Sequence, residues 1–299
     1  MGTQLLARRP GFRGCLEELN ISDPESVRQT HREYVLAGAE VVETNTFGAN
    51  RVRLAGSDLC RRVDQVNRTA VSLAREAAGP EAFVAGAVGP LGCRIVSSAA
   101  VGQPDGIPGP VARAAFQEQI ASLVGAGVDL VVLETFSHLD ELGEALAAAG
   151  DVATRKTPLV VQVSLNSEGI MADGATIEEL LQFLALWRPA AIGCNCSEGP
   201  ASIRSAIERM AAQPGCTVSA QPSAGLPQRQ GEQLVYPSSE GDFDDWAAWA
   251  LENGVQIVGG CCGTTPDHIR AVRSVAEDWR HRPQRAAALG FAPGLSRAT

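Results

Sequence analysis

A repeated unit along the chain most constrains its fold: an amphipathic helix, a glycine, a short hydrophobic strand and then a polar residue. Segments 34–47, 123–136 and 250–261 each follow this order. Near-continuous hydrophobic strands between helices indicate a parallel sheet that is buried on both faces. A chain of 299 residues, 45% of them hydrophobic, is long enough to close this unit into one barrel. We therefore predict an α/β fold of the (β/α)8, or TIM, type.

Seven strands can be placed along the sequence, one fewer than such a barrel needs. They are expected near 40–45, 82–88, 128–134, 158–164, 189–195, 217–222 and 255–260. Side-chain caps support this spacing, because a hydroxyl or carboxylate can accept hydrogen bonds from free amides at the start of a helix. The predicted caps are Ser22, Thr176 and Thr265. The glycines predicted to end helices are Gly38, Gly127 and Gly254.

Composition argues against nucleic acid and membranes as partners. The formal net charge is −9, and so acidic a chain repels the phosphates of nucleic acid and of anionic lipid. No apolar stretch approaches the roughly 20 residues of a membrane span, and the N-terminus has no apolar secretion core. These features predict a cytoplasmic protein with one domain over 1–282, followed by a tail or the start of a linker over 283–299.

Three cysteines follow two of the predicted strands. Cys196 ends the strand near 189–195, and the pair Cys261 and Cys262 follows the strand near 255–260. In parallel α/β folds this carboxyl edge carries the chemistry. Neighbouring residues on a strand face opposite ways, so the pair can share a metal only where the strand has ended. Three thiolates can hold one zinc ion and leave its fourth position open to a substrate.

A cysteine is also a small hydrophobe that packs well in a core. Cys194 has this buried role in our interpretation, because it should face the same side as Cys196 one step deeper in the strand. The other cysteines assigned to packing are Cys15, Cys60, Cys93 and Cys216. His31 and His268 are interpreted as surface or packing residues, and the Gly- and Pro-rich segment 222–241 as a flap over the site or as surface loop.

Four motifs occur in a fixed order along the chain. They are Glu43-Thr-Asn-Thr-Phe-Gly-Ala-Asn50, Glu134-Thr-Phe136, Gly193-Cys-Asn-Cys196 and Gly259-Gly-Cys-Cys-Gly-Thr-Thr-Pro266. With these motifs the chain resembles the homocysteine S-methyltransferase family from residue 1 to about 280. Segments 1–5 and 15–20 are most similar to the homocysteine domain of bifunctional methyltransferase/methylenetetrahydrofolate reductases and of cobalamin-dependent methionine synthase.

The resemblance implies a (β/α)8 barrel with zinc on the three cysteines named above and the homocysteine thiolate as the fourth ligand. Glu134 is similar to the family's acid that receives the homocysteine ammonium group, although a buried ion pair is an alternative role. Asn45 is a second candidate for substrate binding, with Glu43 and Thr46 as other groups on the same rim. The implied activity is zinc-dependent methyl transfer to homocysteine, giving methionine. The alternatives are a barrel that acts on another thiol, or a non-catalytic zinc barrel that serves a folate reductase as a partner module.

The methyl donor is open. Betaine enzymes of this family hold a quaternary ammonium group among aromatic rings. This chain has Gly48 and Thr135 at the matching positions and two tyrosines in all, which argues against betaine. Methylcobalamin, S-methylmethionine or another donor stays open, and a corrinoid or folate donor would have to be carried by another domain or chain.

Two departures from the family pattern stand out. Relatives usually have a strand ending in Asp-Gly before the segment that matches Met1-Gly-Thr. We therefore expect the first barrel strand to be missing from these residues and the protein to begin upstream of Met1. Ser223 stands where the pattern usually has Asn.

Overall fold

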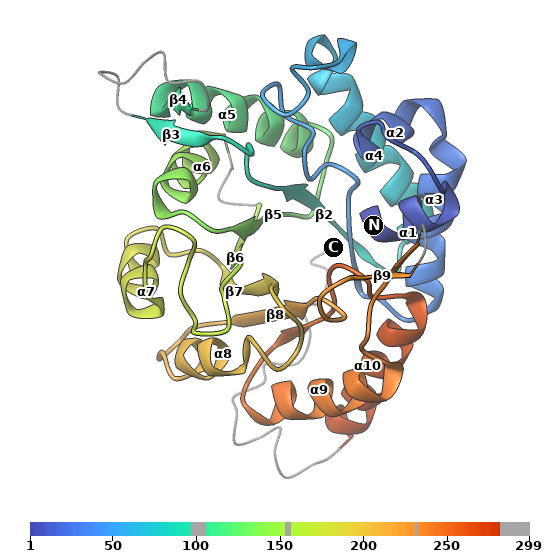
Figure 1. The fold of residues 1–299 in the computed structure, drawn as a ribbon, viewed down its shortest axis with the longest axis vertical. Coiled ribbons are helices and arrows are strands. Elements are labelled where there is room, and N and C mark those ends of the chain that lie inside the picture. The colour runs from blue at the N-terminus through green and yellow to red at the C-terminus, as the bar shows by residue number, and fades with distance from the viewer. Residues whose placement is uncertain (97–105, 153–156, 231–232, 282–299) are drawn as a thin grey trace.

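The sheet of this protein is a curled, parallel, seven-stranded half-barrel with helices around its outside (Figure 1). The computed structural model describes residues 1–96, 106–152, 157–230 and 233–281, so the tail predicted over 283–299 lies outside them. Neighbouring strands in the sheet follow one another along the chain. The strands are β1 (Val41–Glu43), β2 (Phe83–Val88), β5 (Leu130–Phe136), β6 (Leu159–Val163), β7 (Ala191–Cys196), β8 (Val218–Pro222) and β11 (Ile257–Val258). All seven predicted strands are confirmed, and the half-barrel is consistent with the TIM type.

The helices that follow these strands cover the outer face of the sheet (Figure 1). The longer ones are α3 (Pro24–Leu36), α4 (Val63–Ala78), α5 (Gly109–Gly125), α6 (Leu139–Val152), α7 (Ile177–Ala185), α8 (Arg204–Ala211), α9 (Glu240–Glu252) and α10 (Pro266–Arg280). The shorter ones are α1 (Gly2–Arg8), α2 (Leu19–Ser22), η1 (Leu16–Glu18) and η2 (Asp58–Arg61). Two small sheets lie outside the half-barrel: β3 (Arg94–Val96) with β4 (Gly106–Pro108), and β9 (Gln228–Gln230) with β10 (Gln233–Val235). Among the described residues, no helix combines the length and apolar character that crossing a bilayer requires.

Most of the predicted helix boundaries agree with the structure. Thr176 caps α7 in a reciprocal capping box, and Thr265 is the N-cap of α10. The prediction for α3 is wrong by one residue, because Ser22 is still the last residue of α2. Asp23 takes the cap instead, and its carboxylate accepts a hydrogen bond from the Ser26 amide. The three predicted terminal glycines all have positive φ angles: Gly38 (97°), Gly127 (87°) and Gly254 (82°).

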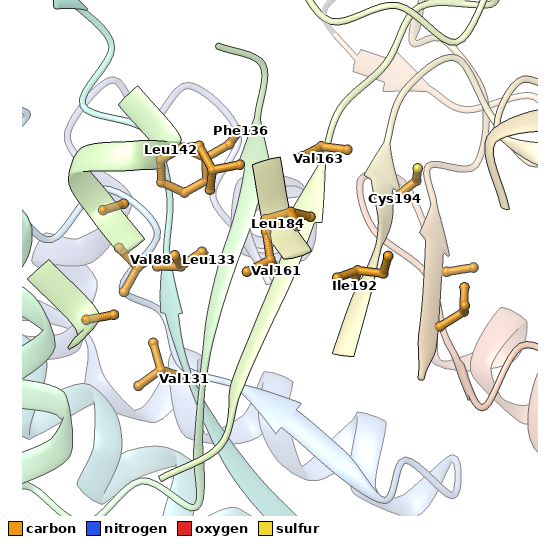
Figure 2. Packing of buried hydrophobic residues seen from close by; sticks show 14 of the residues in the cluster. Val88, Val131, Leu133, Phe136, Leu142, Val161, Val163, Leu184, Ile192 and Cys194 are labelled. Atoms are coloured by element: carbon orange, nitrogen blue, oxygen red, sulfur yellow. The ribbon is translucent and has the colours of Figure 1, made fainter. Parts of the chain in front are cut away.

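Alternate residues of the central strands face two different cores, as expected for a sheet that is buried on both sides. One set packs against the surrounding helices, including α6 and α7 (Figure 2). Its members include Val131, Leu133, Val161, Val163, Leu142 and Leu184. The intervening residues form a smaller cluster: Ala85, Val132, Val160 and Ala191. Because both faces are occupied by packing, the chain's reactive side chains gather at the strand ends.

The outer strands of the described sheet are β1, which pairs with β2, and β11, which pairs with β8. The N-terminal residues form α1, whose Leu5 is fully buried. From α1, the Gln4 side chain donates a hydrogen bond of 3.3 Å to the carbonyl oxygen of Thr264, just beyond β11. The expected strand upstream of Met1 stays a prediction.

Both histidines singled out in the sequence have packing roles rather than surface ones. His31 is 2% exposed, and His268 is 7% exposed. The ring of His268 meets Phe243 edge-on at 4.8 Å, and its Nε2 lies 3.0 Å from the carbonyl oxygen of Ser238. Burial lowers the pKa of His31 to about 3, so this ring is neutral in the folded protein at neutral pH.

Candidate metal and substrate site

Three cysteine sulfurs converge at the carboxyl end of the sheet. Cys196 is the last residue of β7, whereas Cys261 and Cys262 follow β11, with β8 between the two strands. The three Sγ atoms lie within 4.8 Å of one another, and those of Cys196 and Cys262 are 3.5 Å apart. The structure thus brings together the residues that the sequence predicted as metal ligands.

A left-handed turn aims Cys196 at the other thiols. Strand alternation alone would place it on the side of Cys194, which is fully buried in the helix-facing core (Figure 2). Cys196 and Ser197 instead have φ angles of 59° and 60°, a region that costs a non-glycine residue on the order of 1–3 kcal/mol. The packing role of Cys194 is confirmed, but the reason given for it from alternation is wrong, because the chain leaves strand geometry at Cys196.

The Cys261–Cys262 loop is held by its backbone as a continuation of the β8–β11 ladder. The Cys261 amide donates to the Pro222 carbonyl oxygen at 2.8 Å, and the Ala224 amide donates to the Cys262 carbonyl oxygen at 2.8 Å. Because β11 has already ended at Val258, the two adjacent side chains escape the alternation of a regular strand. Both thiols can therefore face one point.

The thiol cluster suits a soft, tetrahedral cation. Four ligands about 2.3 Å from zinc lie about 3.8 Å from one another. The Cys196 and Cys262 sulfurs, 3.5 Å apart, are close to that spacing, and all three sulfurs lie within 4.8 Å of one another. Hydrogen bonds among the three thiols lower the pKa of Cys262 and raise the pKa values of Cys196 and Cys261, so a single negative charge on the cluster lies on Cys262. Thiolate ligands favour zinc over hard cations such as magnesium.

Glu134 lies at the end of β5, beside this cluster. Glu134 is only 8% exposed, and its Oε2 accepts a 3.2 Å hydrogen bond from Asn195 Nδ2. The β5–β6 register is irregular between Leu133 and Phe136, which is where Glu134 is presented. Burial, followed by the nearby Glu43 carboxylate, raises the pKa of Glu134, and burial likewise raises that of Glu43. A cationic group bound between the two carboxylates would relieve this repulsion.

Asn45, the other predicted substrate residue, lies just after β1 and is hydrogen-bonded to residues of η1 and α2. Its Nδ2 donates to the Leu16 carbonyl oxygen at 2.8 Å and to Asn20 Oδ1 at 3.0 Å. The Asn20 amide in turn donates to the Asn45 carbonyl oxygen at 2.9 Å. This network ties the rim loop to α2. A contact between Asn45 and substrate stays a prediction.

Ser223, the departure from the family pattern, connects the loops around the thiols. Its amide donates to the Cys196 carbonyl oxygen at 2.9 Å. Its hydroxyl donates to the carbonyl oxygens of Ser197 at 2.9 Å and Gly225 at 3.2 Å. The hydroxyl therefore braces the left-handed turn that orients Cys196.

Tyr236 is a site residue that sequence reasoning missed. It follows the β9–β10 hairpin, within the segment predicted as a flap or surface loop. Its ring lies on the backbone of Gly263, where an added Cβ would stand 2.1 Å from the ring Cγ. Burial, followed by the charges of the three nearby cysteines, raises the pKa of Tyr236. The available signal was the glycine after Cys262, which leaves room for a neighbouring ring, but nothing in the sequence identifies Tyr236 as that neighbour.

Fold and site together define a parallel α/β half-barrel with a cluster of three cysteine thiols, which could hold a metal ion, at the carboxyl ends of its strands. The chain belongs to the homocysteine S-methyltransferase family, whose sequence pattern matches residues 1–276.

Relatives with assigned names agree with this membership. The chain is 32% identical over 288 residues to methionine synthase of Mycobacterium leprae (strain TN), covering 91% of this chain and 23% of that protein. It is 31% identical to methionine synthase of Mycobacterium tuberculosis (strain ATCC 25618 / H37Rv), covering 99% of this chain and 25% of that protein. The chain thus spans about a quarter of the length of these relatives.

Solved structures share the fold. The metallated form of the homocysteine methyltransferase MmuM from Escherichia coli superposes with a TM-score of 0.74 at 22% identity, covering 92% of this chain and 93% of that one. A methyltransferase from Methanosarcina mazei gives a TM-score of 0.58 at 15% identity, covering 93% and 91%.

Proposed function

We propose that this chain is a zinc-dependent homocysteine S-methyltransferase, forming methionine from homocysteine. The observation that carries the proposal is the convergence of Cys196, Cys261 and Cys262 beside the buried carboxylate of Glu134. Family membership and the methionine synthase relatives support the choice of homocysteine. The metallated form of the Escherichia coli enzyme supports a metal at the thiols.

The three cysteines would hold zinc as thiolates and leave one position for a fourth ligand. A free thiol has a pKa of about 8.5 and is mostly protonated at neutral pH. Zinc bound there would supply the positive charge that keeps a substrate thiol deprotonated and nucleophilic. Because three thiolates outweigh the charge of the ion, the substrate sulfur retains electron density for attack on a methyl group.

Glu134 would bind the other end of the substrate. A carboxylate beside a thiol site matches an aminothiol, whose ammonium group would offset the repulsion between Glu134 and Glu43. Fixing both ends leaves the sulfur in one orientation toward the methyl donor, as an in-line displacement requires. This second anchor distinguishes homocysteine from simple thiols.

The methyl donor stays open between S-methylmethionine, a corrinoid or folate carried by another domain or chain, and other donors. Betaine is disfavoured, because Gly48 and Thr135 offer no rings for a quaternary ammonium group. In the structure Gly48 lies instead against Glu17, whose carboxylate accepts a hydrogen bond from the Gly48 amide at 2.6 Å.

A donor screen with zinc-loaded protein tests the proposal. Homocysteine would be offered with methylcobalamin, S-methylmethionine, methyltetrahydrofolate or betaine, and methionine would be measured by mass spectrometry. We expect methionine with at least one donor other than betaine, and none from Cys262→Ala protein. Failure of zinc-loaded protein to bind homocysteine at all, measured by calorimetry, would refute the proposed function whatever the donor.

A further inference from the structure

Asn195 is a fully buried amide between the packing residue Cys194 and the metal-ligand candidate Cys196. A polar side chain at such a position destabilises the fold unless its donors and acceptors are satisfied. The Asn195 side chain is satisfied by hydrogen bonds, and its partners are Glu134, Thr135 and Cys261, which all lie at the site.

One side chain connects the groups that would hold the two ends of the substrate. Asn195 Oδ1 accepts from the Thr135 amide at 2.8 Å, and its Nδ2 donates to Thr135 Oγ1 at 2.8 Å and to Glu134 Oε2 at 3.2 Å. The same Nδ2 lies 3.8 Å from the Sγ of Cys261. Asn195 thus contacts the carboxylate, the turn that presents it and one of the thiols.

The turn at Thr135 needs such a brace. Thr135 has a φ of 63°, which is costly for a β-branched residue, at the irregular part of β5. Its amide would lack a regular sheet partner there, and Asn195 Oδ1 supplies one. Without Asn195 the turn could relax toward ordinary strand geometry and move the Glu134 carboxylate with it.

We propose that Asn195 is a positioning residue that sets the separation between the thiol cluster and the Glu134 carboxylate, and thereby selects the chain length of the aminothiol. This inference rests on the proposed function. A fixed separation favours a substrate whose sulfur and ammonium group span it, so homocysteine is preferred to cysteine, which is one methylene shorter. Asn195 needs no contact with the substrate to do this.

The test compares two nearly isosteric apolar substitutions of buried amides. Asn195→Leu removes the brace. Gln162→Met is the matched control, because Gln162 is also fully buried and its Nε2 bonds Ser219 Oγ at 2.7 Å. Zinc-loaded wild type and both variants would be titrated calorimetrically with homocysteine and with cysteine. Circular dichroism and zinc content would confirm that each protein is folded and loaded.

We expect the preference for homocysteine over cysteine to fall about tenfold or more in Asn195→Leu and to change less than about twofold in Gln162→Met. If Asn195→Leu cannot be purified, Asn195→Ser carries the same expectation, since its shorter hydroxyl cannot reach Thr135 and Glu134 together. An unchanged preference, or an equal loss in the control, overturns the inference while leaving the proposed function intact. If the wild-type protein binds neither homocysteine nor cysteine, the proposed function is refuted, and this inference is refuted with it.

Discussion

Replacing Glu134 by Gln removes a negative charge at the predicted ammonium site while keeping the size of the side chain. Glu134 is 8% exposed, so its bond with a substrate ammonium group would be shielded from water. A hydrogen bond to a charged group contributes about 1.5–3 kcal/mol. At about 1.4 kcal/mol per tenfold change, this predicts homocysteine binding weaker by about 10- to 150-fold.

The assay is calorimetric titration of zinc-loaded wild type and Glu134→Gln with homocysteine and with 4-mercaptobutyrate, which has the thiol and carboxylate but no amine. The variant should bind 4-mercaptobutyrate as the wild type does, and its zinc content should be unchanged. An equal loss of affinity for both ligands would assign Glu134 to the structure of the site. Unchanged homocysteine affinity in Glu134→Gln would show that Glu134 does not bind the substrate ammonium group.

Three further perturbations test the metal site, the loop beside it and the buried histidine. Cys262→Ala should lose zinc, measured by elemental analysis, whereas Cys194→Ala should keep it; full zinc in the first variant would contradict the three-thiolate site. Gly263→Ala should lower the free energy of unfolding by more than Gly127→Ala, because both glycines have positive φ but of the two only Gly263 would bring its new Cβ against a ring, that of Tyr236. Gly127→Ala, the control, should cost about 1–2 kcal/mol. Equal losses in the two variants, measured by urea denaturation, would show that the ring contact has no effect on stability. His31 has a folded-state pKa of about 3, below its unfolded value of about 6.5, so stability falls as pH drops below 6.5. From pH 7.5 to 5.5 wild type should therefore lose about 1.4 kcal/mol more than His31→Leu, and parallel pH profiles would rule this out.

The sequence predicts the order and spacing of the strands well, because the strands are short hydrophobic runs, and three of them follow a helix and a glycine and lead into a polar residue. The runs before Cys196 and Cys261 also predict that these thiols share one rim, since parallel strands end at the same edge. That inference needs only local patterns and the rules of parallel sheets.

The details of the site depend on backbone geometry that local patterns do not encode. The left-handed angles of Thr135 and Cys196 break strand alternation at residues other than glycine, where the sequence gives no warning. Tyr236 follows the β9–β10 hairpin and its ring lies against Gly263, and the Asn45 side chain is hydrogen-bonded to Asn20 of α2. Each of these outcomes is decided by contacts between segments distant in the sequence.

The position of the thiols on either side of β8 has a consequence for folding. Cys196 and Cys262 are 66 residues apart in sequence, and β11, which leads to the second of them, is a two-residue strand at an edge of the described sheet. A zinc ion bound by both would act as a cross-link, and closing a loop of that length costs an unfolded chain about 4 kcal/mol of conformational entropy, as a disulfide would. Such a link would keep the edge strand from fraying. Zinc supply would then govern how much of the protein stays folded as well as how fast it works.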